Sequence, residues 1–203
     1  IDSSGLTIAA SVGTEITADV TGMTILFSAT ENWSGSETFT ITVGDGQYEA
    51  SDDVVVTVTP ENDVPTIVLP DSFSFNEDES LVEDFTSYLN DIDGDDLILT
   101  ATNSANIFAV VDGFNVAFTA TENWNGSEEL TFTVNDQQGR AVASDVTTVV
   151  VDPVNDTPTI DLTSLSIEFA EDGNTTIDFT GYVEDIDSSG LTIAASVGTE
   201  ITA

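Results

Sequence analysis

The sequence predicts an all-β protein built from repeated β-sandwich modules, and two observations carry this prediction. Short runs of alternating apolar and polar residues, rich in β-branched side chains, are separated by Gly, Asn and Asp along all 203 residues. This pattern is typical of strands and turns, and no segment shows the spacing of an amphipathic helix. The chain also repeats itself, because residues 1–18 recur without a change as residues 186–203.

A looser repeat of about 92 residues lies inside the long one. The segment 60–67, PENDVPTI, returns as 153–160, PVNDTPTI, and 29–36, ATENWSGS, returns as 120–127, ATENWNGS. Four of the five prolines lie in the two Pro-x-Asn-Asp-x-Pro segments. Proline lacks a backbone donor and stiffens an extended chain, which suits a connector between modules. We therefore expect module boundaries at these two linkers.

This division predicts one complete module and parts of two others. Residues 62–154 form the complete module, residues 1–61 form the C-terminal part of a module, and residues 155–203 form the N-terminal part of a further one. The two parts together make up about one more module, because residues 186–203 repeat residues 1–18. The chain is thus interpreted as a window on a longer array, cut at an arbitrary phase.

The complete module has the strand content of an immunoglobulin-like sandwich, which has about seven short strands in roughly 100 residues. Phe132 and Val134 alternate with Thr131 and Thr133, so one face of that strand is expected in the core and the other in water. Asp112-Gly113 is expected to form a two-residue hairpin turn. The expected strands lie at 66–69, 73–76, 80–85, 97–102, 107–111, 114–119, 129–135 and 142–151.

The charge of the chain is extreme, with 38 acidic residues against one base, Arg140, and a formal net charge of −37. Self-repulsion of this size opposes the compact state, so the fold is expected to need abundant salt or bound cations. A well-solvated halophilic surface is the simpler alternative. A polyanion is not expected to bind nucleic acid or an anionic membrane surface. The apolar runs are also too short for a membrane span, so no direct membrane insertion is expected.

The donor chemistry indicates calcium and an extracellular location. The chain has no Cys and no His, so disulfides and thiolate or imidazole metal sites are excluded. Oxygen ligands from carboxylates, amides and carbonyls suit the hard ion Ca²⁺, which often stabilises secreted modules that lack disulfides. Residues 1–5 do not resemble a signal peptide, so an export signal is expected elsewhere.

The acidic residues gather in segments that recur once in each module. The run Asp91–Asp96 is destabilised by like-charge repulsion unless a cation binds it, although acid-rich turns can also be simply solvated. It is not an EF-hand loop, because Gly94 stands fourth and Thr102 stands twelfth. The recurring segments are Glu77–Glu79, Glu171–Asp172, Asp91–Asp96, Asp185–Asp187, Asn62–Asp63, Asn155–Asp156, Glu31, Glu122, Asp45 and Asp136.

These motifs together resemble the cadherin-like tandem repeats of giant bacterial extracellular adhesins, and the resemblance covers the whole chain. It implies Greek-key sandwich modules with Ca²⁺ held at the junctions between them, by the outgoing module, the linker and the incoming module. By position, the first junction would use Glu31, Asn62, Asp63, Asp91, Asp93 and Asp136. The second junction would use Glu77, Glu122, Asn155, Asp156, Asp185 and Asp187. The linkers carry Val64 and Thr157 where cadherins usually have a second Asn, so one ligand at each junction differs.

The resemblance implies a calcium-stiffened structural extender of a cell-surface adhesin, whose partners are neighbouring repeats or identical subunits. One alternative is a self-assembling extracellular filament, in which the end fragments of different chains complete one another by domain swapping. Another is a glycan-binding adhesive module that uses Trp33 and Trp124, which are otherwise expected to plug the edge of the core. An enzyme is not expected, because no Ser-His or Cys-His pair exists and Arg140 is the only base.

Overall fold

The computed structural model describes residues 5–139, 142–188 and 190–196, and in this part the regular elements are β-strands apart from one short 3-10 turn. Residue contacts divide the chain into two units. The first unit comprises residues 1–68, 86–100 and 132–145, and the second comprises residues 69–85, 101–131 and 146–203. The prediction of an all-β fold is confirmed. The module boundaries at the linkers remain a prediction.

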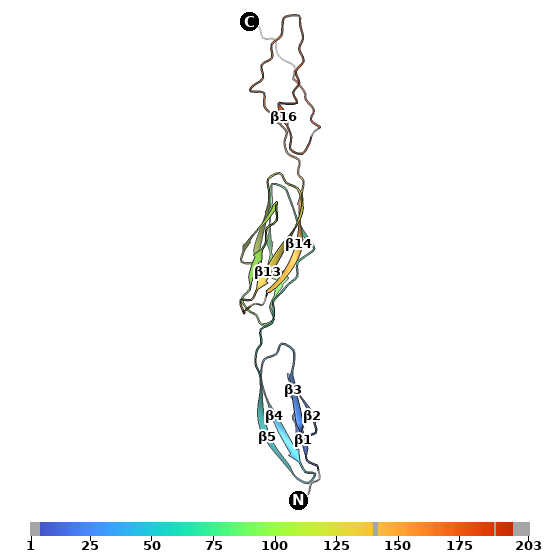
Figure 1. The fold of residues 1–203 in the computed structure, drawn as a ribbon, viewed down its shortest axis with the longest axis vertical. Helices are drawn as coiled ribbons and strands as arrows, with labels where there is room; N and C mark the ends of the chain where they lie inside the picture. The colour runs from blue at the N-terminus through green and yellow to red at the C-terminus, as the bar shows by residue number, and fades with distance from the viewer. Residues whose placement is uncertain (1–4, 140–141, 189, 197–203) are drawn as a thin grey trace. The chain divides into compact units, whose positions relative to one another are not determined.

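The first 60 residues form a small set of antiparallel strands, of which β4 and β5 are the longest pair (Figure 1). β1, β4 and β5 make one sheet, and β2 and β3 make a hairpin that turns at Gly22, where φ is +61°. The buried side chains are Ile16 and Phe39, and the Phe39 ring lies 5.1 Å from that of Phe27. The strands are β1 (Thr7–Ala10), β2 (Ile16–Thr21), β3 (Thr24–Ala29), β4 (Gly35–Gly44) and β5 (Glu49–Val58).

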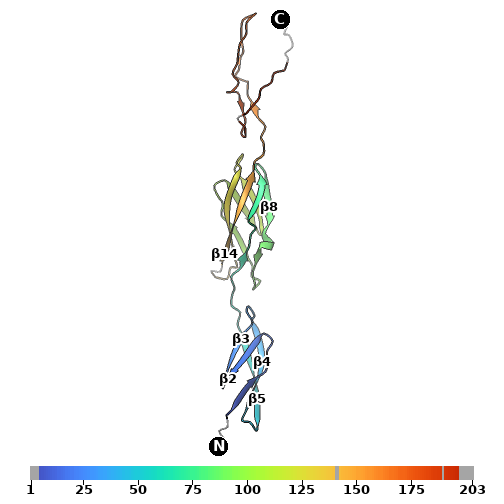
Figure 2. The ribbon, with the colours of Figure 1, turned by 90° about the vertical axis from the view of Figure 1, so that its right-hand side faces the viewer.

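Residues 66–152 form a four-stranded and a three-stranded sheet, and Figure 2 shows one strand of each, β14 and β8. One sheet has the order β10-β13-β14-β7, with β14 and β7 parallel, and the other has the order β11-β12-β8. The short strands β6 and β9 pair separately. The strands are β6 (Thr66–Ile67), β7 (Ser72–Asn76), β8 (Ser80–Asp84), β9 (Leu89–Asn90), β10 (Ile98–Ala101), β11 (Ile107–Asp112), β12 (Asn115–Ala120), β13 (Gly126–Asn135) and β14 (Val142–Asp152).

The core follows the predicted alternation. Phe132 and Val134 on β13 are fully buried, and Thr133 lies on the other face, where its hydroxyl is 2.8 Å from that of Ser144. Phe118 is also fully buried, and its ring lies 5.5 Å from that of Phe73 and 6.3 Å from that of Phe85. Clusters of offset aromatic rings of this kind contribute more than their buried area alone.

The structure differs from the sequence prediction in one hairpin loop and in one additional turn, and several strand ends are shifted by one to three residues. The hairpin loop between β11 and β12 consists of Gly113 and Phe114, one residue later than the predicted Asp112-Gly113, because Asp112 still pairs with Asn115. Gly113 has φ of +61°, which glycine adopts without strain, so it fixes the first loop position. A 3-10 turn, η1 (Phe85–Tyr88), followed by β9, was not predicted because it lacks alternation.

Residues 155–196 carry little regular structure in their described part. β15 (Thr159–Ile160) pairs with β16 (Val183–Glu184), in the same way that β6 pairs with β9. Among the described residues, no helix is long and apolar enough to cross a membrane.

The two Trp residues are half-buried and lie against glycines of the strands that follow them. A Cβ added at Gly35 would lie 2.7 Å from the Trp33 ring, and one added at Gly126 would lie 2.9 Å from the Trp124 ring. Each indole therefore covers a bare glycine backbone at the start of β4 or β13. This packing is what a plug at the edge of the core requires.

Candidate metal sites at two carboxylate clusters

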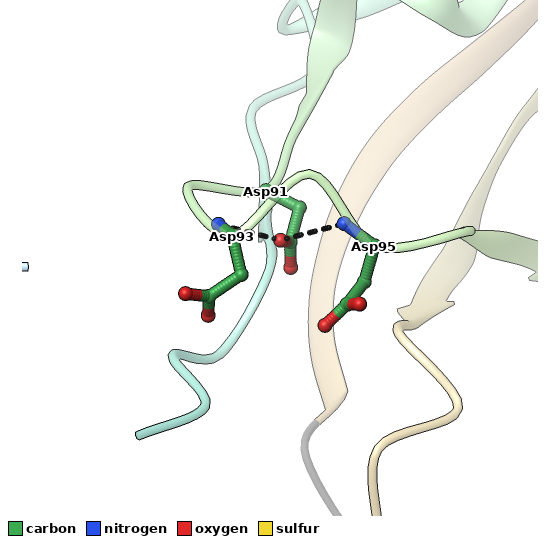
Figure 3. Close-up of side chains that lie close together, drawn as sticks. All are labelled: Asp91, Asp93 and Asp95. Carbon is green, nitrogen blue, oxygen red and sulfur yellow. Dashed lines mark hydrogen bonds between the residues drawn. The ribbon is translucent and has the colours of Figure 1, made fainter. Parts of the chain in front are cut away.

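The first cluster is built on the turn between β9 and β10. Oδ1 of Asp91 accepts hydrogen bonds from the backbone N–H groups of Asp93 (3.0 Å), Gly94 (2.9 Å) and Asp95 (3.2 Å). Gly94 has φ of +78°, so the turn needs glycine at this position. The turn gathers one carboxylate oxygen from each of Asp91, Asp93 and Asp95 within 4.8 Å of one another (Figure 3).

The first linker and the end of β13 also reach this turn. The backbone N–H of Asp63 donates to Oδ2 of Asp93 at 2.7 Å. Nδ2 of Asn62 donates to Oδ2 of Asp136 at 2.9 Å and to the carbonyl of Asp63 at 3.1 Å. Asp136 is a carboxylate with only 1% of its surface exposed. The linker is thus held against the carboxylate turn by its backbone and by an amide side chain.

The second cluster repeats the first in residues 155–188. Oδ1 of Asp185 accepts from the N–H groups of Asp187 (3.0 Å) and Ser188 (2.6 Å), and the N–H of Asp156 donates to Oδ2 of Asp187. Nδ2 of Asn155 donates to the carbonyl of Asp156 at 2.7 Å. The linker and the Asp-x-Asp turn therefore make the same contacts twice in one chain.

The second cluster also includes acidic residues from the loop after β7. Glu77 is 1% exposed, and its Oε1 accepts from the N–H of Val154 at 2.7 Å. Asp78, at φ of +62°, accepts from the N–H of Asn123 at 3.0 Å. Burial raises the pKa of Asp156, and the negative charges of Asp187, Asp78, Glu77 and Asp185 raise it further. Four other carboxylates therefore act on Asp156 at this place.

Both clusters have donor atoms that suit a hard divalent cation, and the residues that the structure describes supply no positive charge to balance their carboxylates. Oδ2 of Asp91 and Oδ2 of Asp156 are buried, and neither has a hydrogen-bond partner among the described residues. A buried charged oxygen without a partner is costly, so such atoms call for a positive charge. No Lys, Arg or His lies in the described part of the chain, because Arg140 falls outside it. Carboxylate, amide and carbonyl oxygens are the donors that Ca²⁺ prefers.

The structure places most of the predicted ligands in these clusters. Asn62, Asp63, Asp91, Asp93 and Asp136 meet in the first, and Glu77, Asn155, Asp156, Asp185 and Asp187 meet in the second. Glu31 and Glu122 are exposed in the turns before β4 and β13. As ligands, all of these residues remain predictions.

Sequence reasoning did not select two acidic residues that the clusters contain, Asp95 and Asp78. Both stood in acidic segments that the sequence marked. For Asp95 the signal was the every-second-residue spacing Asp91, Asp93, Asp95, which continues the Asp-x-Asp motif by one step.

Two further carboxylates, on Glu37 and Glu128, hold loops in place and are not part of either cluster. Glu37 accepts from the backbone N–H groups of Thr14, Glu15 and Ile16 at 2.8–3.1 Å, and Glu128 accepts from those of Asn106 and Ile107 at 2.9 and 3.2 Å. Both bridge a loop to the start of a long strand, at equivalent places in the repeat. The Ser104 hydroxyl and the N–H of Asn106 lower the pKa of Glu128 to about 2 from 4.5.

This lowered pKa predicts a pH dependence for Glu128→Gln. Because the folded pKa lies below the unfolded one, ionised Glu128 stabilises the fold above about pH 4.5, and this stabilisation is lost as the pH falls towards 2. The variant should unfold at lower urea than the parent at pH 7, and this difference should narrow below about pH 4.5 and disappear only below about pH 2. Urea titrations at several pH values measure this. Glu129→Gln, an exposed neighbour, is the matched control, and an equal loss in both variants would contradict the prediction.

In comparisons with known proteins, residues 62–152 match a family model described as "Bacterial Ig domain". The chain is similar to human protocadherin-24 EC1-2, with 17% identity, a TM-score of 0.51 and coverage of 76% of this chain and 84% of that one. It is similar to protocadherin gamma B2 extracellular cadherin domains 1–5, with 16% identity, a TM-score of 0.51 and coverage of 76% and 34%. The predicted resemblance to cadherin-like and immunoglobulin-like repeats is confirmed at the level of the fold.

A more distant match is an endo-fucoidan hydrolase of glycoside hydrolase family 107, with 16% identity and a TM-score of 0.39 over 77% of this chain. The chain spans about a quarter (26%) of that protein and about a third (34%) of the protocadherin gamma B2 structure. The sequence matches none of the curated proteins with which it was compared.

Proposed function

We propose that this chain, which carries a cadherin-like and Ig-like β repeat, is a calcium-stiffened structural extender of an extracellular, adhesin-type surface protein. The observation that carries the proposal is the buried, partnerless carboxylate oxygen in each cluster, on Asp91 and on Asp156. Each lies next to an Asn-Asp-x-Pro linker, so the demand for positive charge recurs at the two predicted module boundaries.

The residues proposed to hold calcium are the carboxylates and linker groups of the two clusters. Bound calcium would supply the positive charge that these carboxylates lack. In its absence, like charges such as Asp156 and Asp187 repel one another and oppose the closed arrangement of linker and turn. The hydrogen bonds from Asp63 to Asp93 and from Asp156 to Asp187 fix the linker only while that arrangement persists. Stiffening is therefore proposed to follow from relief of charge repulsion at the linkers.

The extracellular setting and the non-catalytic role are part of the same proposal. Calcium sites in extracellular modules bind at roughly 10⁻⁴ to 10⁻³ M, which suits a calcium-rich exterior rather than a cell interior. The chain has no His and no Cys, so its sequence allows no Ser-His or Cys-His catalytic pair. Its proposed partners are adjacent repeats or identical subunits.

Calcium is expected to raise the melting temperature of the chain and to reduce its flexibility. With a dissociation constant of roughly 10⁻⁴ to 10⁻³ M, about 10 mM calcium stabilises each site by about 1.4–2.7 kcal/mol. For a domain of this size that corresponds to a rise of roughly 5–20 °C. Differential scanning calorimetry with calcium and with EDTA measures the rise, and small-angle scattering measures the change in flexibility.

Magnesium and sodium at matched ionic strength separate specific binding from charge screening. Magnesium requires nearly octahedral geometry and sheds water reluctantly, so it is expected to give a smaller rise. An equal rise with sodium would assign the effect to screening alone. Melting and scattering curves that do not change between EDTA and calcium would overturn the proposal.

A further inference from the structure

The hairpin loop after β13 is two residues longer than the equivalent loop after β4. The offset between the two repeats is 91 as far as Asp136, which aligns with Asp45, and it is 93 from Gly139 onwards. The two residues without a counterpart are therefore Gln137 and Gln138. Each loop joins neighbouring strands of one sheet, β4 to β5 and β13 to β14.

The shorter loop shows that the hairpin does not need the insertion. Oδ1 of Asp45 accepts hydrogen bonds from the backbone N–H groups of Gln47 and Tyr48, both at 2.8 Å, and the N–H of Asp45 donates to the carbonyl of Tyr48 at 3.2 Å. β4 and β5 remain paired up to Gly44 and Glu49, on either side of this loop. The extra residues of the longer loop are therefore available for another role.

Both inserted glutamines lie against the carboxylate turn of the first cluster. Nε2 of Gln137 donates to the carbonyl of Asp96 at 3.1 Å, and Nε2 of Gln138 donates to Oδ1 of Asp95 at 3.3 Å. The backbone N–H of Gln138 also donates to Oδ1 of Asp136 at 2.8 Å. The insertion thus connects the end of β13 with the turn between β9 and β10.

Gln137 adopts a backbone conformation that is unfavourable for a residue with a Cβ atom. Its φ of +62° lies in the left-handed region. Its N–H donates to Oδ1 of Asn135 at 2.6 Å, while its side chain reaches the carbonyl of Asp96. Such a conformation persists where surrounding contacts compensate for its cost. The contacts between the insertion and the turn are contacts of this kind.

The insertion brings two amide donors to a turn that like charges oppose. One carboxylate oxygen from each of Asp91, Asp93 and Asp95 lies within 4.8 Å of the others. A hydrogen bond to a charged acceptor is stronger than one between neutral groups, so the amide of Gln138 partly offsets the repulsion at Asp95. An amide carries no net charge, so the turn keeps its full negative charge.

We propose that Gln137 and Gln138 form a bridge that holds the first carboxylate turn against the end of β13 when no calcium is bound. The inference rests on the proposed function, because it describes how the same site is regulated. The N–H of Asp63 donates to Asp93 of this turn, so the bridge keeps the first linker closed at calcium concentrations too low to fill the site. A chain without the insertion needs calcium to reach the same degree of closure.

Amide hydrogen exchange in EDTA, followed by NMR, tests the bridge. The reporter amides are those of Asp93 and Gly94, which donate to Asp91 in the closed turn. Gln138→Ala removes the side-chain donor and keeps the backbone N–H that donates to Asp136. The reporter amides should then exchange about two- to tenfold faster, as expected for the loss of one hydrogen bond.

Two further variants and one control sharpen the comparison. Gln138→Glu places a carboxylate opposite Asp95 and should accelerate exchange more than Gln138→Ala does. Deletion of Gln137 and Gln138 gives the loop the length of its counterpart after β4, so this variant should keep its circular dichroism and exchange faster at the reporter amides. Gln47→Ala, at an exposed glutamine of the counterpart loop, is the matched control and should exchange as the parent does. Unchanged exchange in Gln138→Ala or in the deletion variant, or equal acceleration by Gln47→Ala, would overturn the proposal.

Calcium separates the bridge from the proposed function. About 10 mM calcium should slow exchange of the reporter amides in Gln138→Ala by at least about tenfold, to the rate of the parent in EDTA or below. If calcium slows exchange in no variant while the differences in EDTA persist, the calcium site is wrong and the bridge stands. If calcium slows exchange and the variants match the parent in EDTA, the bridge is wrong and the calcium site stands.

Discussion

Asp91→Asn is expected to abolish the part of the calcium-dependent rise in melting temperature that the first cluster contributes. The amide keeps an Oδ1 acceptor for the three backbone N–H groups of the turn, so the turn itself should persist. It replaces the buried, partnerless Oδ2 with a neutral donor, which removes a charged ligand. The expected loss is the full calcium stabilisation of one site, about 1.4–2.7 kcal/mol at about 10 mM calcium.

In EDTA the same substitution should change the unfolding free energy in the opposite direction. Without a cation, Asp91 lies within 4.8 Å of the carboxylates of Asp93 and Asp95, and its removal relieves this repulsion. A rise of up to about 1 kcal/mol in unfolding free energy is expected, as for other partly exposed charge pairs. A variant that is more stable than the parent in EDTA and less stable in calcium cannot be explained by a simple packing defect.

Asp112→Asn is the matched control, because it removes one charge from the exposed hairpin between β11 and β12. It should leave the calcium response intact. Calorimetry of parent, Asp91→Asn and Asp112→Asn, each with calcium and with EDTA, makes the comparison. Equal calcium responses in Asp91→Asn and the parent would remove Asp91 from the proposed site.

The strands were predictable because their signal is local. Alternation marked β13 and placed Phe132 and Val134 inside, and the structure agrees. The hairpin loop was misplaced by one residue, because both Asp112-Gly113 and Gly113-Phe114 put the glycine at a loop position. Only the pairing of Asp112 with Asn115 distinguishes the two loops, and this pairing depends on the partner strand. The η1 turn and β9 carry no periodic signal at all.

The candidate site residues were predictable where they lie close together in sequence. They were less predictable where their role depends on which way a side chain points. Asp91 and Asp93 follow from the Asp-x-Asp motif, whose turn is closed by its own side chain. For Glu122 and Glu128, sequence alone did not indicate which one would face inward. The structure leaves Glu122 exposed and uses Glu128 to accept the backbone N–H groups of a neighbouring loop. That difference depends on strand register and on a loop some 20 residues away in sequence.

Phe118→Ala is expected to be the most destabilising single substitution considered, at about 3–5 kcal/mol. Phe118 is fully buried, and its ring lies against those of Phe73 and Phe85, so truncation leaves a cavity between two aromatic side chains. Urea denaturation of the dilute chain measures the loss. A cost below about 1 kcal/mol would show that this core is not packed as described.

The equivalent substitution Phe27→Ala supplies the internal comparison, because residues 27 and 118 occupy the same position of the repeat. Phe27 is half-buried, and its ring lies 5.1 Å from that of Phe39. In dilute solution, truncation of Phe27 should therefore lower the unfolding free energy by roughly half as much as truncation of Phe118, in proportion to the area that each ring buries. Urea denaturation of both variants measures the two losses, and equal losses would contradict the difference in burial between Phe27 and Phe118.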